Sequence, residues 1–379
     1  MRTFVRFETI GLSLLLIALG CTSATPQTSL LSSFSQYTFG RGTDGDVTVI
    51  ASMSSGDSFS NGKRLVNLSR VIGTTNGRKL TMESSQFGST DVLPGDEVMW
   101  HALAAYPETI CGKDLEAGRY GFGIVKKTES AGGYISNITL DRPISPQPTT
   151  INAAAISASL SGHVDSICVL VLVRVHNFKN FKVQATGMNI NLSSGSLDNG
   201  GGIIAVKVAD TMTISADGGY VNFDAAGFGN TNGSFAGGVG GISNNNSGQR
   251  ANGPNCGDAG QSGVAAGGGA GSNIGLGGNG IGGNNAISGE TNFVVADDCP
   301  GCRKLFMGGS GAGGSYVPTF NGGNGGTGGG IIIISARKID LIGPGMKKFS
   351  ANGENGGSSG SSGSGGGGGG GGAGGTVFI

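Results

Sequence analysis

The sequence predicts an all-β protein whose β-rich N-terminal half leads into a glycine-rich, parallel β-helix-like solenoid with polyglycine loops. A glycine triplet followed by an apolar strand-like run occurs at residues 200–208 and again at 328–336, and a third copy begins at residue 374. The four consecutive isoleucines at 331–334 favour a strand, because β-branched side chains suit a pleated sheet better than a helix. Strands that recur after glycine-rich detours of unequal length are typical of a solenoid with stacked rungs.

Composition narrows the class of protein. Glycine contributes 78 of 379 residues, which is about three times its usual share. Charged residues make up 13% and the formal net charge is zero. We therefore expect no nucleic-acid partner, because binding phosphates requires clustered Lys and Arg. Glycine is concentrated after about residue 195, which divides the chain into a domain at 36–190 and a glycine-rich domain at 191–379.

The first residues have the pattern of an export signal. Arg2 and Arg6 precede an apolar run at 10–19 that is too short to span a bilayer, so we predict a signal peptide at 1–20. It ends in Ala-Leu-Gly-Cys, which resembles the lipobox of bacterial lipoproteins. The resemblance implies a lipid on Cys21 that anchors the protein to a membrane. Ala18 and Leu19 depart from the lipobox pattern, which leaves ordinary secretion as the alternative. Residues 21–35 are rich in Ser and Thr and suit a tether.

Short strand-like runs bounded by Gly, Pro and Asp fill residues 36–190, and no long stretch has a helical apolar period. The clearest runs lie at 46–50, 97–100, 118–125, 134–140 and 167–175.

Several short phrases recur here in a characteristic order. Gly-x-Asp-Gly-Asp-Val-Thr-Val at 42–49 is followed by Pro-Gly-Asp-Glu-Val at 94–98, Ala-Gly-Arg-Tyr-x-Phe at 117–122 and Ile-Thr-Leu-x-x-Pro-Ile at 138–144. A valine-rich strand and a rung opening on Gly-Gly-Gly-Ile come next. This order resembles large glycine-rich cell-surface proteins of Gram-negative bacteria, over residues 38–230 and again over 322–379. The resemblance implies a secreted, β-rich protein of the outer membrane or cell surface, and it carries over no catalytic residue.

In the second half, each copy of the repeat contains short apolar stretches separated by bends, as in one coil of a parallel β-helix. We expect 203–208 and 331–336 to be parallel neighbours or near neighbours, and 376–379 to pair alongside 331–335. Gly/Ser-rich sequence is disordered by default. The competing interpretation is an extended polyglycine conformation whose strands pack laterally, similar to the polyglycine sheaf at the adhesin tips of phage tail fibres. Glycine's backbone entropy opposes that order.

The cysteines suggest disulfides rather than a metal site. Residues 299–302 read Cys-Pro-Gly-Cys, but no histidine lies nearby to complete four zinc ligands. In an exported protein a disulfide is the better interpretation, with Cys256 paired to Cys299 or Cys302. Cys111 and Cys168 are a second candidate pair. With Cys21 lipidated, five cysteines remain, so at least one is unpaired or bonds another chain.

No cofactor, metal or catalytic residue is expected. Asp44 and Asp46 are candidate calcium ligands, but paired acids in turns more often cap backbone N–H groups. A β-helix polysaccharide-degrading enzyme would need paired, tuned acids and bases, and the rungs show no clustered carboxylates.

We therefore expect a non-catalytic, lipid-anchored, structural or adhesive surface protein. The alternative is a module that binds cell-surface glycans, a receptor or other surface proteins through aromatic residues on the glycine-rich loops: Phe228, Phe235, Tyr316 and Phe320.

Overall fold

The computed structural model describes residues 39–51, 53, 57–65, 68–83, 87–106, 118–145, 167–184, 188–189, 202–215, 220–227, 304–315, 321–342, 349–358, 367 and 369–379. Within these ranges the protein is all-β and contains no helix, as the sequence predicts. It follows that no helix in this part of the chain is able to cross a membrane.

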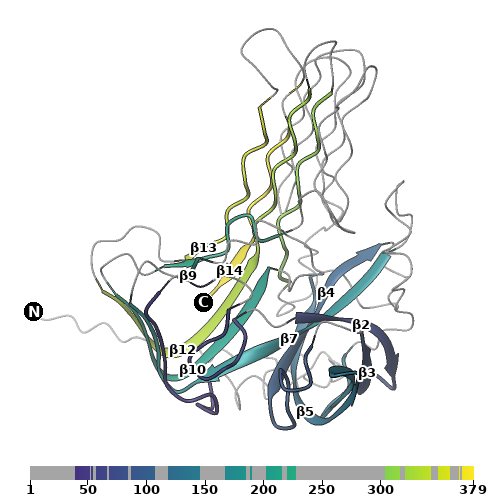
Figure 1. Ribbon diagram of the computed structural model, residues 1–379, viewed down its shortest axis with the longest axis vertical. Helices are drawn as coiled ribbons and strands as arrows, with labels where there is room; N and C mark the ends of the chain where they lie inside the picture. Colours follow the sequence, from purple (N-terminus) through teal and green to yellow (C-terminus); the bar gives the residue numbers. More distant parts are fainter. Residues whose placement is uncertain are drawn as a thin grey trace, which may run out of the picture. The chain divides into compact units, whose positions relative to one another are not determined.

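Six antiparallel strands close into a barrel (Figure 1). They are β2 (Leu68–Thr75), β3 (Lys79–Met82), β4 (Glu97–Tyr106), β5 (Tyr120–Ala131), β6 (Tyr134–Leu140) and β7 (Ile167–Phe178). The order is β7-β2-β3-β6-β5-β4, and β4 pairs with β7 to complete the circle. Asn76 and Gly77, both with positive φ, join β2 to β3 in the turn geometry that suits a tight hairpin. Inward side chains such as Leu80, Trp100 and Leu172 fill the interior.

A parallel ladder begins where the chain leaves the barrel. β7 bends into β8 (Phe181–Val183), and β10 (Ile203–Ile214) pairs parallel with both. β12 (Ile331–Leu341) pairs parallel with β10, and β14 (Thr376–Phe378) pairs parallel with β12. Ile331 lies opposite both Ile203 and Thr376, so the predicted parallel pairing of the two repeat copies and the predicted pairing of the C-terminal strand alongside β12 are confirmed.

Shorter strands extend this arrangement. β1 (Val47–Val49) pairs parallel with β8. A separate three-stranded parallel sheet contains β9 (Met188–Asn189), β11 (Val221–Asn222) and β13 (Phe349–Ser350). The ladder strands β8, β10 and β12 are followed along the chain by β9, β11 and β13, respectively, so each of these three repeats contributes one strand to each parallel sheet.

The predicted parallel β-helix-like solenoid is nevertheless wrong as a description of the fold. The apolar run of β7 is buried on both faces: Leu170 and Leu172 face the barrel interior, and Val171 and Val173 face the parallel ladder. Over Leu170–Val173 both edges of β7 pair antiparallel, with β2 and β4, so the chain closes a barrel instead of starting a coil. The division of the chain at residue 190 stays a prediction, since β7 belongs to both the barrel and the ladder.

The first half of β10 and of β12 is also buried on both faces. Ile203, Ala205, Ile331 and Ile333 pack against the outer wall of the barrel. Alternate residues of the same strands form a second core on the other face: Ile204, Val206, Val208, Ile332 and Ile334. Two-sided burial explains why these strands read as continuous apolar runs rather than as alternating ones.

Four glycine-rich segments, 308–315, 322–330, 351–357 and 367–375 (of which 368 is not described), are hydrogen-bonded to one another, and we call them the glycine sheaf. The donors and acceptors recur every third residue. Gly308, Gly311 and Gly314 donate to Gly329, Gly326 and Gly323, each over 2.8 Å, so these two segments are antiparallel. Gly323, Gly326 and Gly329 donate to Gly367, Gly370 and Ala373 over 2.7–2.9 Å, so that pair is parallel.

The remaining contacts complete a bundle. Glu354 and Gly357 donate to Thr327 and Asn324, and Gly369, Gly372 and Gly375 donate to Gly357, Glu354 and Ala351. A three-residue repeat without internal hydrogen bonds is the geometry of an extended, polyproline-like helix. Figure 1 shows the segments as green-to-yellow traces that run alongside one another, and two of them continue into β12 and β14. The described glycine-rich segments thus follow the packed alternative rather than the disordered one.

Packing inside the sheaf excludes side chains at specific positions. A Cβ built on Gly372 would lie 2.0 Å from the carbonyl oxygen of Thr327, and one on Gly326 would lie 2.2 Å from that of Glu354. At Gly371 the nearest atom would be 3.6 Å away, which is an ordinary contact. Glycine is therefore required at some sheaf positions and dispensable at others.

We predict that Ile332→Asp strongly destabilises the protein. Ile332 is fully buried between β10 and β14, and a buried unpaired charge costs several kcal/mol. Ile342→Asp is the matched control, because Ile342 follows the same strand and is 52% exposed. Denaturant unfolding measures both variants. An effect of Ile332→Asp within about 0.5 kcal/mol, the usual range for surface substitutions, would contradict the two-sided burial of β12.

We also predict that neighbouring glycines of the sheaf differ in their tolerance of alanine. Gly372→Ala should lower the free energy of unfolding by about 1–3 kcal/mol, as overpacking does, whereas Gly371→Ala should stay within about 0.5 kcal/mol. Amide hydrogen exchange should rise around 369–375 in Gly372→Ala alone. Equal responses of the two variants would show that the segment is not packed as described.

Candidate functional site

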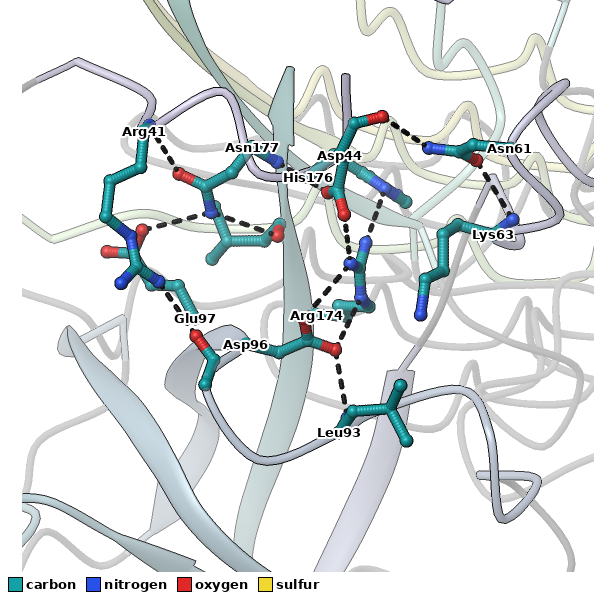
Figure 2. A network of polar contacts seen from close by, with 12 residues as sticks. Arg41, Asp44, Asn61, Lys63, Leu93, Asp96, Glu97, Arg174, His176 and Asn177 are labelled. Atoms are coloured by element: carbon teal, nitrogen blue, oxygen red, sulfur yellow. Dashed lines mark hydrogen bonds and ion pairs between the residues drawn. The ribbon is translucent and has the colours of Figure 1, made fainter. Parts of the chain in front are cut away.

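Buried charged and polar side chains gather where the barrel and the parallel ladder share β7. We call this group the buried polar cluster; Figure 2 shows most of it. Its members are Arg174, His176 and Asn177 on β7, Glu97 at the start of β4, Asp96 in the turn before β4, Asp44 in the loop before β1, and Lys207 on β10. The members on β4, β7 and β10 are each at most 7% exposed. Such a concentration of buried charge requires that every member has a partner.

Arg174 is the centre of one half of the cluster. Its Nη2 lies 2.6 Å from Asp44 Oδ1, and its Nε lies 3.3 Å from Asp96 Oδ2. Burial acts to lower the pKa of Arg174, but the hydrogen bond and charge of Asp44, together with Asp96, outweigh burial and raise it. The guanidinium therefore stays charged between two carboxylates that come from loops far apart in sequence.

His176 extends this half toward the loop before β2. Arg174 Nη1 donates to His176 Nδ1 over 3.1 Å, and His176 Nε2 donates to the carbonyl of Leu65 over 3.0 Å. The ring stacks on Phe178 with centroids 5.5 Å apart. Burial, together with the positive charge of Arg174, lowers the pKa of His176 to about 4. His176 is therefore neutral at pH 7.

Glu97 is the centre of the other half. Its Oε1 accepts from Lys207 Nζ over 2.6 Å, and its Oε2 accepts from Asn177 Nδ2 over 3.2 Å. The Lys207 ammonium lies 4.2 Å from the centre of the Phe122 ring. Asn177 Oδ1 accepts from the backbone N–H of Arg41 over 3.3 Å. One carboxylate thus bridges a primary amine and a carboxamide in a buried site.

A second buried histidine connects the barrel to the base of the glycine sheaf. His101 Nε2 on β4 donates to the carbonyl of Leu305 over 2.9 Å, and burial lowers the pKa of His101 to about 4. Leu305 N–H donates to Gly118 over 2.9 Å. Phe306 packs into the barrel core, while Leu305 and Met307 pack with the ladder. The chain is therefore attached to the barrel before it enters the sheaf.

Asp44 and Asp46, considered as calcium ligands, cap backbone N–H groups instead. Asp44 Oδ2 accepts from Asn177 N over 2.8 Å, and Asp46 Oδ1 accepts from Asn180 N over 3.1 Å. Among the residues that the structure describes, no group of three or more His, Cys, Asp or Glu side chains is placed to hold a metal ion.

Most residues that the sequence singled out lie outside the described ranges: Cys21, Cys111, Cys256, Cys299, Cys302, Phe228, Phe235, Tyr316 and Phe320. Cys168 lies in β7, opposite Ala105 of β4. Lipidation, the disulfides and the aromatic binding residues therefore stay predictions.

Sequence reasoning missed the buried polar cluster. A usable signal was present, because Arg174 and His176 interrupt the apolar run of β7, and Lys207 interrupts that of β10. A charged residue inside a strand that is apolar on both sides needs a buried partner. The sequence did not reveal which of the carboxylates would provide it.

No known protein family matches the sequence, and no curated protein matches it. The charged side chains of the buried polar cluster pair with one another. Its members come from the barrel strands β4 and β7, the ladder strand β10 and the loop before β1.

We predict that stability falls as pH falls from about 6.5 toward 4. The two buried histidines have a folded pKa of about 4, below their ordinary value of 6.5, so in this window the unfolded chain binds protons that the folded one does not. Each histidine contributes up to about 1.4 kcal/mol per pH unit. His101→Gln keeps a donor for Leu305 and removes the titration, so the slope between pH 6.5 and 5 should fall by about half. An unchanged slope would contradict the burial of His101.

Proposed function

We propose that this protein is a lipid-anchored, surface-exposed structural or adhesive protein of a Gram-negative bacterium, with a non-catalytic role. The observation that carries the proposal is the glycine sheaf, in which four chain segments are bonded to one another every third residue. Such a bundle offers backbone groups and a defined shape rather than the tuned acids and bases that catalysis needs.

The attachment of the sheaf supports a mechanical role. Two of its segments continue without a break into β12 and β14, which pair parallel to each other in the ladder. A third begins after Leu305, Phe306 and Met307, which pack into the cores. Force on the sheaf would therefore pass into the ladder, where the first half of β12 is buried on both faces.

The predicted export signal at the N-terminus supports a location at the outer membrane or cell surface. A lipid on Cys21 and a Ser/Thr-rich tether would hold the β-strands near a membrane with the sheaf available to partners. Cell-surface glycans and other surface proteins are the partners that suit an adhesive surface of this kind.

The test combines anchoring with adhesion. Cells that express the full chain should incorporate labelled fatty acid into the protein, expose it to protease added to intact cells, and adhere to a glycan-coated surface. Cys21→Ser should lose the label and release the protein from membranes, because the acylated thiol is missing. Persistent labelling of this variant would rule out the anchor.

The sheaf has its own control in the same assay. Gly372→Ala should remain anchored yet adhere less than Gly371→Ala, since only the first substitution disturbs the sheaf. Equal adhesion by both variants, with normal surface exposure, would contradict an adhesive role for the sheaf.

A further inference from the structure

We propose that Lys207 and Asn177 form an intramolecular isopeptide bond, with Glu97 as the proton-transferring acid and base. The bond would join Lys207 Nζ to the side-chain carbonyl carbon of Asn177 and release ammonia. This covalent modification goes beyond the proposed function and stands or falls independently of it.

The strand register brings the two reacting side chains together. β7 and β10 are parallel neighbours, and Asn177 lies directly opposite Lys207. Residues opposite each other on neighbouring strands project from the same face of the sheet, with backbones about 4.8 Å apart. The amine and the carboxamide are therefore adjacent by virtue of the sheet, not by virtue of flexible loops.

Glu97 touches the two nitrogens that must exchange protons. One of its oxygens lies 2.6 Å from Lys207 Nζ, the nucleophile, and the other lies 3.2 Å from Asn177 Nδ2, the leaving group. A general acid or base has to be within hydrogen-bond reach of the proton it moves, and Glu97 meets that condition at both ends.

The reacting side chains are shielded from solvent. Glu97 and Asn177 are each 2% exposed, and Lys207 is 7% exposed and lies against the Phe122 ring. Among the described residues, Lys207 is the only lysine that is buried.

The oxygen that would gain negative charge also has a donor in place. The backbone N–H of Arg41 points at Asn177 Oδ1 over 3.3 Å. A fixed backbone donor at a developing oxyanion lowers the barrier to attack on a carbonyl carbon. Figure 2 shows Arg41 and Glu97 on the two ends of the Asn177 carboxamide.

The steps balance without any other reagent. Glu97 takes a proton from the Lys207 ammonium, and the free amine forms a bond to the Asn177 carbonyl carbon. Glu97 then returns the proton to the carboxamide nitrogen, the carbon–nitrogen bond breaks, and ammonia leaves. The nitrogen that attacked loses its extra proton to the departing ammonia, so an ammonium ion and a secondary amide are the products. Glu97 ends as it began, as a carboxylate.

The consequence is a covalent connection between a barrel strand and a ladder strand. The bond would close the chain between residues 177 and 207, and such closure restricts the unfolded state in the way a disulfide does. Unlike a disulfide, it would not respond to reductant.

Peptide mapping of the folded wild-type protein is the deciding experiment. We expect one branched peptide that contains both Lys207 and Asn177, with a mass lower than the sum of its two arms by one ammonia molecule. Trypsin should fail to cleave after Lys207. A succinimide at Asn177 would also lose ammonia, but it would give linear peptides. A folded protein that yields only linear peptides for both residues would overturn the proposal.

Two variants test the role of Glu97. Glu97→Gln has the same shape but cannot carry the proton, so the branched peptide should be lost by more than tenfold. Glu129→Gln is the matched control, because Glu129 also pairs with a lysine, at 2.8 Å from Lys79, on the exposed side of β5; it should keep the branched peptide in full. A branched peptide at the wild-type level in folded Glu97→Gln would exclude Glu97 as the proton carrier.

Discussion

The requirement that every buried charge has a partner organises this fold around Arg174. The guanidinium is 1% exposed in a strand that is apolar on both sides, so the chain has to bring carboxylates to it. Asp44 arrives on the loop before β1, where it also caps Asn177, and Asp96 arrives on the turn before β4, where it caps Leu93. One buried cation thus fixes both the start of the barrel strand β4 and the edge strand β1 of the ladder.

The glycine sheaf depends in turn on the register of the ladder. Gly330 and Gly375 immediately precede β12 and β14, and a Cβ on Gly375 would lie 1.8 Å from the carbonyl oxygen of Gly330. Thr376 N–H donates to Gly330 over 3.0 Å, and Gly329 N–H donates to Ala373 over 2.7 Å. The hydrogen bonds therefore pass without interruption from the two-residue period of the strands to the three-residue period of the sheaf. The register of β12 and β14 therefore determines which residues of the sheaf segments are hydrogen-bonded to each other.

The local sequence pattern predicted which segments form strands better than it predicted how those strands are arranged in sheets. The β-branched run at 331–334 and its copies predicted strands, and the repeat itself predicted that 203–208 and 376–379 lie beside 331–336, as they do. The barrel was not predicted, because two-sided burial gives β7 the same continuous apolar sequence as a solenoid rung. The buried polar cluster was not predicted either, because Glu97, Asn177 and Lys207 are up to 110 residues apart. The pairing of β7 with β10 places Asn177 opposite Lys207, and the closure of the barrel between β4 and β7 brings Glu97 to them.

The glycine sheaf becomes ordered because its segments are attached to the barrel and the ladder, and the buried polar cluster lies where these two parts meet. Glycine loses more conformational entropy on ordering than any other residue, so a polyglycine segment gains order only if its ends are already held. His101 holds one segment through the Leu305 carbonyl, while the ladder holds the segments that lead into β12 and β14. The ladder is in turn attached to the barrel along β7 and β10, where Asn177 lies opposite Lys207. A covalent bond at that position would strengthen one of the connections through which load on the sheaf reaches the barrel.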